Sequence, residues 1–243
     1  KLTKSTTQTL INLKIHKYFV LSDYLVAQLP SLKRTKVTSF LPIFFPEIKS
    51  SPLEKPEGDF WVTIPGGVEL KRRNYLGMLE ELALTAPKKN VRFIILGKAA
   101  DTSEDVRLFK SRLEAIGLRE RFVFFDDYLD NGTFYAYLNH SDLILPLIDE
   151  STQGRRYNYS RHQASGTFGL AIGFAKPMLS EPFFTRFEDF QACSFFYQKG
   201  HLVERINELA ANRDLLAAKE REIDEYPKFK FDHQRQNYLD FIA

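Results

Sequence analysis

The sequence contains very little cysteine and no long apolar segment. Cys193 is the only cysteine among 243 residues, which excludes an internal disulfide framework and a cysteine-based zinc cluster. The simple interpretation is a reducing compartment. No apolar run approaches the ~18 residues of a membrane span, and the polar residues 1–8 do not resemble a signal peptide. We therefore expect a cytoplasmic protein, with peripheral contact at the inner face of the membrane as a further option.

Several catalytic motifs are also missing. The sequence has no Gly-x-x-x-x-Gly-Lys-Ser/Thr phosphate loop and no Gly-x-Ser-x-Gly nucleophile elbow. No Gly-x-Gly-x-x-Gly fingerprint follows the first strand expected in the main domain, which argues against an NAD enzyme. The histidines lack the spacing of metal ligands: His16, His140, His162, His201 and His233. We expect neither a metal ion nor a resident cofactor.

The charge balance is only mildly basic. The chain is 44% hydrophobic and 27% charged, which is typical of a soluble globular protein. Its formal net charge is +3 and its pI is about 8.8. This bias suits anionic small molecules or a membrane surface, and it does not single out nucleic acid as a partner.

Short apolar runs alternate with helical patterns along most of the chain. Strands are predicted at residues 61–64, 92–96, 122–125, 143–146 and 177–179. Helices are predicted at residues 75–86, 103–116, 133–139, from 166 onward, at 204–225 and at 236–242. The alternation predicts an α/β fold with a parallel sheet. Because the strands are almost continuously apolar, helices should cover both faces, as in a Rossmann-like domain.

The pattern divides the chain into four parts. Residues 1–41 predict a helix, a strand at 18–21 and a helix at 24–29, too little to bury a core of their own. Residues 42–58 contain four prolines and are expected to form an extended linker. Residues 59–228 form the main domain, and residues 229–243 contain a terminal helix.

Ligands of open parallel sheets bind beyond the carboxyl ends of the strands, so the loops there are the candidate sites. After the first strand, Gly66 and Gly67 permit close backbone approach. Arg72 and Arg73 follow, and their guanidinium groups match phosphate oxygens. The alternative is a solvated basic turn. Lys98 ends the second strand and would lie beside a phosphate, unless it is an ordinary surface lysine.

The loops after the third and fourth strands are candidates too. Asp127 and Tyr128 would offer backbone groups and an aromatic face to a base, or the acid would merely cap the next helix. The fourth loop enters its helix through Ser165, Gly166 and Thr167, where free N–H groups and the helix dipole favour an anion. An ordinary capped helix is the alternative. The preceding basic stretch adds candidates for donor or acceptor binding: Arg155, Arg156, Tyr159, Arg161 and His162.

Five segments resemble, in their order, the C-terminal domain of glycosyltransferases of the GT-B fold, particularly the retaining family 4, or group 1. They are residues 64–75, 93–97, 117–125, 137–146 and 165–177. The resemblance covers about 120 residues, counted from 60 to 180. It implies the donor-binding half of a sugar transferase. That enzyme would move a sugar from a nucleotide-diphosphate sugar to a saccharide or lipid-linked acceptor, in the synthesis of surface polysaccharide or glycoconjugates.

The resemblance also assigns the parts of the chain. It implies that residues 59–228 bind the nucleotide-sugar and that residues 1–41 are a remnant of the N-terminal, acceptor-binding domain. Residues 229–243 would be the helix that crosses back over the cleft. The chain is then expected to lack most of the acceptor domain and to be incomplete for catalysis alone. The diphosphate would be bound by the glycine loop at Gly66 and Gly67, by the helix start at Ser165, and by the cations Arg72, Arg73 and Lys98. The base would be bound by Asp127 and Tyr128.

Many members of the family have two glutamates eight positions apart around the helix that begins at Gly166. This sequence has Ser165 and Gly173 at those positions, and it has Gly67 where many relatives have arginine. Phosphate charge would therefore be neutralised by Arg72, Arg73, Lys98 or the basic loop, and no catalytic residue is assigned. Two alternatives stay open. One is a non-catalytic domain that binds nucleotide-sugar or a partner. The less favoured one is a sugar-nucleotide epimerase of the same architecture.

Overall fold

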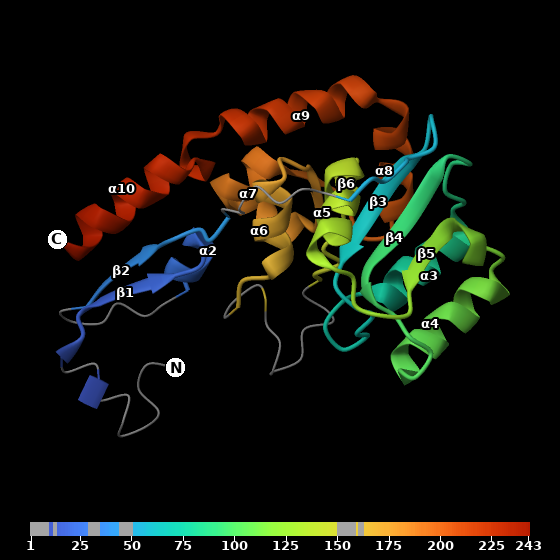
Figure 1. The fold of residues 1–243 in the computed structure, drawn as a ribbon, viewed down its shortest axis with the longest axis horizontal. Coiled ribbons are helices and arrows are strands. Elements are labelled where there is room, and N and C mark those ends of the chain that lie inside the picture. The colour runs from blue at the N-terminus through green and yellow to red at the C-terminus, as the bar shows by residue number, and fades with distance from the viewer. Residues whose placement is uncertain (1–9, 12–13, 29–34, 44–50, 150–158, 160–162) are drawn as a thin grey trace.

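A parallel sheet of six strands forms the centre of the fold (Figure 1). The structure is a computed structural model that describes residues 10–11, 14–28, 35–43, 51–149, 159 and 163–243. The strands lie in the order β5-β4-β3-β6-β7-β8. They are β3 (Phe60–Pro65), β4 (Val91–Lys98), β5 (Phe122–Phe125), β6 (Leu143–Ile144), β7 (Met178–Ser180) and β8 (Ser194–Phe196). All their pairings are parallel, so the predicted sheet is confirmed.

Helices cover both faces of this sheet because its central strands are apolar on both sides. In β3, Phe60 and Val62 face one core cluster and Trp61 faces the other, and all three are buried. One face carries α3 (Tyr75–Leu84), α4 (Glu104–Ala115) and α8 (Leu202–Ala211). The other carries α5 (Asn131–His140), α6 (Gly166–Gly173) and α7 (Glu188–Cys193). The helix α9 (Arg213–Glu225) contributes Leu216 to the first core cluster and Ile223 to the second. The doubly covered Rossmann-like sheet predicted from the apolar strands is therefore confirmed.

Some elements differ from the prediction. The single helix expected at residues 204–225 is two helices, because Asn212 interrupts it and accepts the N–H of Leu215 to cap α9. The sequence pattern missed α7, β8 and β2 (Lys36–Ser39) because elements of three to six residues show no measurable period. Three short 3₁₀ turns were also missed: η1 (Arg119–Arg121), η2 (Pro182–Arg186) and η3 (Pro227–Phe229).

The N-terminal segment forms a small layer beside the main domain. β1 (Lys17–Val20) pairs in parallel with β2, and α2 (Asp23–Val26) follows β1. The terminal helix α10 (Phe231–Ile242) lies along these strands (Figure 1). The rings of Phe19 and Tyr238 stack with centroids 5.0 Å apart, and the backbone N–H of Leu41 donates to Oε1 of Gln234 at 2.9 Å. These contacts join the two ends of the chain.

The strand order fixes where a ligand would bind. The chain runs from β3 outward through β4 and β5, and then returns to the other side of β3 as β6. At such a reversal the loops leaving the carboxyl ends of neighbouring strands diverge and leave a crevice. No helix in the described part of the chain is long and apolar enough to span a bilayer.

Candidate functional site

The loop that follows β3 packs directly against the end of β4. Gly66 has a positive φ of 101°, which glycine adopts without strain, and its N–H donates to the carbonyl of Leu96 at 2.8 Å. A Cβ at Gly97 would lie 2.5 Å from the carbonyl carbon of Gly66. Glycines on both strands therefore let two backbones touch, and this contact sets one wall of the crevice.

Arg73 reaches from this loop to the start of α6. Its Nη2 donates to Oγ1 of Thr167 at 3.1 Å. Its Nη1 is buried and has no hydrogen-bond partner within the part of the chain that the structure describes. A buried unpaired guanidinium nitrogen costs free energy and is rare in native proteins. Among the described residues no acceptor reaches this nitrogen, which makes it a candidate donor to a bound anion.

Arg72 has a different environment, although it is the neighbouring residue. Its Nε donates to the hydroxyl of Tyr159 at 3.0 Å, and its Nη1 pairs with Oε1 of Glu69 at 2.7 Å. Burial lowers the pKa of Arg72, but the bonds to Tyr159 and Glu69 outweigh it and raise the pKa. These partners hold the side chain at the edge of the crevice, between it and the N-terminal layer.

Lys98, Asp127 and Tyr128 form the outer rim. Nζ of Lys98 lies 3.0 Å from Oδ1 of Asp127 and 5.3 Å from the ring centre of Tyr128. Asp127 and Tyr128 are both exposed, Tyr128 by 85%. Exposed ion pairs contribute little stability, so a phosphate can draw Lys98 away from Asp127 at low cost.

The start of α6 forms the opposite wall. Ser165 is its N-cap, and the Ser165 hydroxyl accepts the N–H of Thr167 at 3.3 Å. The first turn of a helix has N–H groups without intrahelical partners, and the helix dipole favours a negative charge there. Gly166 is exposed, and a Cβ at this position would meet nothing within 4 Å. The backbone at Gly166 is thus open to a ligand.

These parts enclose one cavity of about 370 Å³. Nine residues singled out from the sequence line it: Gly66, Gly67, Arg72, Arg73, Lys98, Tyr128, Ser165, Gly166 and Thr167. Asp127 does not line it and contacts it only through Lys98. Arg155, Arg156, Arg161 and His162 lie outside the described residues, and Tyr159 lies against Arg72. Whether these residues bind a ligand stays a prediction.

The sequence reasoning missed several apolar residues of the cavity. They are Pro65, Leu96, Leu129, Phe134 and Leu170, and Gly97 completes the lining. They carry no signal in the sequence, because apolar residues beside strands and helices usually belong to the core. Their presence gives the cavity an apolar side next to its cationic one, which suits a ligand with both a charged group and a ring. Within the described residues, no three acidic, histidine or cysteine side chains gather in a way that would hold a metal ion.

Comparisons with known proteins place this arrangement in a known fold. No protein-family profile and no curated protein matches the sequence. Among solved structures, WaaG, a glycosyltransferase involved in lipopolysaccharide biosynthesis, superposes with a TM-score of 0.57 at 16% identity. The match covers 93% of this chain and 62% of WaaG, so the chain spans less than two thirds of that protein.

Two further structures extend the likeness. Anabaena HepE in complex with UDP-glucose gives a TM-score of 0.60 at 12% identity, over 85% of this chain and 57% of HepE. The C-terminal domain of a group 1 glycosyl transferase from Francisella tularensis gives 0.50 at 10% identity, over 74% of this chain and 86% of that domain. The chain therefore has the GT-B glycosyltransferase fold, and the resemblance read from the motifs is confirmed at the level of the fold.

Proposed function

We propose that the cavity between the glycine loop and α6 binds the diphosphate of a nucleotide-sugar. The observation that carries this proposal is the convergence on one cavity of a helix N-terminus, an open glycine backbone and the buried Nη1 of Arg73, which no described residue pairs. Each of these groups prefers an anion. The apolar residues opposite them would accommodate the base or the sugar ring. The UDP-glucose bound by HepE, which shares the fold, supports a donor of this class.

The chemistry proposed is transfer of the sugar to a saccharide or lipid-linked acceptor. When the bond to the sugar breaks, negative charge develops on the leaving diphosphate. Preorganised donors and cations stabilise that charge without reorganising. Arg73, the N–H groups of α6 and Lys98 would supply this stabilisation, so no metal ion is required. The protein to which this chain belongs would work in the synthesis of surface polysaccharide or glycoconjugates, together with an N-terminal acceptor domain.

A non-catalytic domain that binds nucleotide-sugar is the second candidate. It is favoured by Ser165 and Gly173, which stand where many members of the resembled family have glutamates. The two candidates share the donor site and differ in turnover. A chain that binds UDP-sugar and transfers none of it, even when joined to an acceptor domain, would support the non-catalytic role.

The decisive experiment is isothermal titration of the protein with UDP, GDP, ADP and dTDP, each with and without EDTA. We expect saturable binding of at least one nucleoside diphosphate that EDTA does not weaken. The same titration with the matching nucleoside should give much weaker binding, because the diphosphate would supply most of the contacts. Absence of binding to all four diphosphates would refute the proposed donor site.

A further inference from the structure

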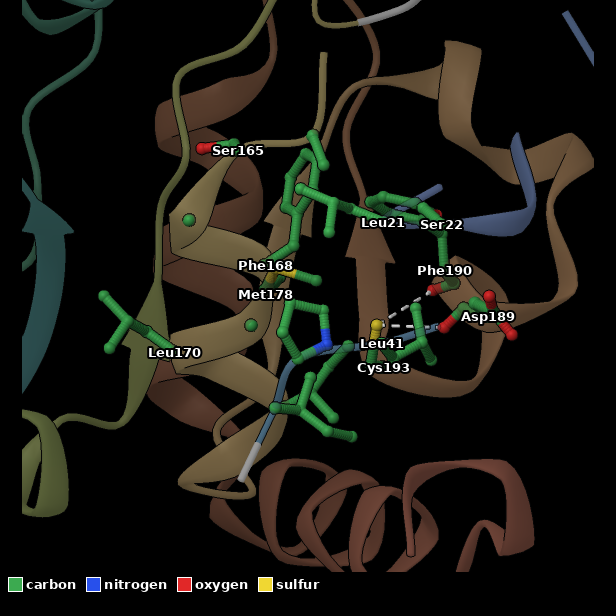
Figure 2. A pocket seen from close by; sticks show the side chains of 16 residues that line it. Leu21, Ser22, Leu41, Ser165, Phe168, Leu170, Met178, Asp189, Phe190 and Cys193 are labelled. Atoms are coloured by element: carbon green, nitrogen blue, oxygen red, sulfur yellow. Dashed lines mark hydrogen bonds between the residues drawn. The ribbon is translucent and has the colours of Figure 1, made fainter. Parts of the chain in front are cut away.

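A second cavity lies along the side of α6 that faces the N-terminal layer. Its volume is about 340 Å³. Leu41, Pro42 and Ile43 form one wall, and Phe168 and Gly169 of α6 form part of the other. Figure 2 shows Leu21, Leu41, Phe168, Met178 and Phe190 gathered around it. The wall is thus built jointly by the N-terminal layer and the main domain.

The floor of this cavity is largely apolar, and the polar groups of Cys193 and Asp189 in it are paired. Leu41, Phe168 and Met178 are buried there. The thiol of Cys193 donates to the carbonyl of Asp189 at 2.9 Å (Figure 2), and burial raises the pKa of that thiol to about 12. The Asp189 carboxylate is bound by Nζ of Lys228 at 2.7 and 2.8 Å.

Water is a poor occupant of such a space. A buried water needs two to four polar partners, and apolar cavities of this kind stay dry or take apolar molecules. Among the described residues, the buried side-chain atoms without a partner are Arg73 Nη1, Gln163 Oε1 and Arg205 Nε. None of the three residues lines this cavity. The chemistry of the lining therefore selects hydrocarbon.

The mouth of the cavity opens beside the proposed donor site. Leu21, Pro42 and Gly166 are exposed, whereas Leu41 and Cys193 are buried, so the three exposed residues border the opening, which reaches the start of α6 at Gly166. Ser165 and Gly166 line both this cavity and the diphosphate cavity. A molecule with its hydrocarbon end in the apolar cavity would hold its polar end next to the first turn of α6.

We propose that this apolar cavity binds one aliphatic chain of the acceptor, which makes the acceptor an amphiphile with its sugar-accepting group at the start of α6. The conclusion that this aliphatic chain belongs to an acceptor rests on the proposed donor function. The binding of an aliphatic chain does not rest on it, because it follows from the lining of the cavity alone.

The test is isothermal titration with n-alkyl β-D-glucosides of increasing chain length, all below their micelle concentrations. Burial of each methylene should raise the affinity about fourfold until the cavity is full, after which the affinity should level off. Leu21→Trp places an indole in the mouth and should weaken binding of the longest glucoside at least about tenfold. Leu84→Trp is the matched control, because Leu84 is 88% exposed and does not line the cavity.

Affinity that does not depend on chain length, or an equal effect of Leu21→Trp and Leu84→Trp, would overturn the proposal. UDP affinity is measured separately on wild type and Leu21→Trp and should be equal in both. Alkyl binding without UDP binding would refute the donor site and leave the apolar site supported. UDP binding without binding of the alkyl glucosides would support the donor site and refute the apolar site.

Discussion

Replacement of Arg73 by alanine should separate ligand binding from stability. Arg73 is partly buried and donates a hydrogen bond to Thr167, and its buried Nη1 has no partner among the residues that the structure describes. A hydrogen bond between a charged group and its partner contributes about 1.5–3 kcal/mol. If Nη1 donates to a phosphate oxygen, Arg73→Ala should therefore weaken nucleoside diphosphate binding by about 10- to 150-fold.

The free protein should hardly be affected by the same change. Alanine removes the hydrogen bond from the charged guanidinium to the Thr167 hydroxyl, worth about 1.5–3 kcal/mol, and also removes a buried donor whose lack of a partner among the described residues costs a similar amount. We expect the free energy of unfolding in urea to change by less than about 1 kcal/mol. A residue held in place only for structural reasons would show the opposite result, with stability lost and binding kept.

Lys71 provides the matched control in the same basic run. It is exposed and does not line the cavity. Loss of its charge should act only through the screened long-range field and weaken binding less than about threefold at physiological salt. Titration calorimetry and urea unfolding of Arg73→Ala, Lys71→Ala and wild type would decide the matter. Equal binding by Arg73→Ala and wild type, or equal losses in both variants, would refute the reasoning.

Three further predictions concern stability around the site. Gly97→Ala should lower the free energy of unfolding by about 1–3 kcal/mol, because the added Cβ meets the Gly66 backbone. Gly166→Ala is the control and should keep the protein folded. A Gly97→Ala variant as stable as wild type in urea titrations would contradict the prediction. Ser165→Ala should cost about 1 kcal/mol by loss of the N-cap, and a change below the error of the same titrations would count against a structural cap. Burial lowers the pKa of Lys228, but its bonds to Asp189 and Asp23 outweigh this and raise it. The contribution of Lys228 to the free energy of unfolding, about 3 kcal/mol, should therefore be complete below the ordinary lysine pKa. It should be lost as the pH rises through the raised pKa of the folded protein. The stability gap between wild type and Lys228→Met should shrink above about pH 10.5, and a gap that stays constant would exclude this origin.

The sequence by itself determined five of the six strands of the sheet and the loops that follow them. Residues 122–125 form an apolar run between two helical patterns, which is typical of a strand in a sheet with helices on both faces. The predicted strand has the same first and last residues as β5. The glycines, cations and helix cap were found for a related reason. Each stands directly after a predicted strand, where a parallel sheet brings its loops together.

Only the tertiary structure decided what each of these residues faces. Arg72 and Arg73 are adjacent and chemically equal, yet Tyr159 and Glu69 hold the first, while the second reaches Thr167 and its Nη1 meets no partner in the described part of the chain. The partners come from distant parts of the chain, and no local pattern encodes them. The apolar cavity was hidden for the same reason: Leu41 and Phe168 read as ordinary core residues, and the space between them exists only because the N-terminal layer and α6 leave it unfilled.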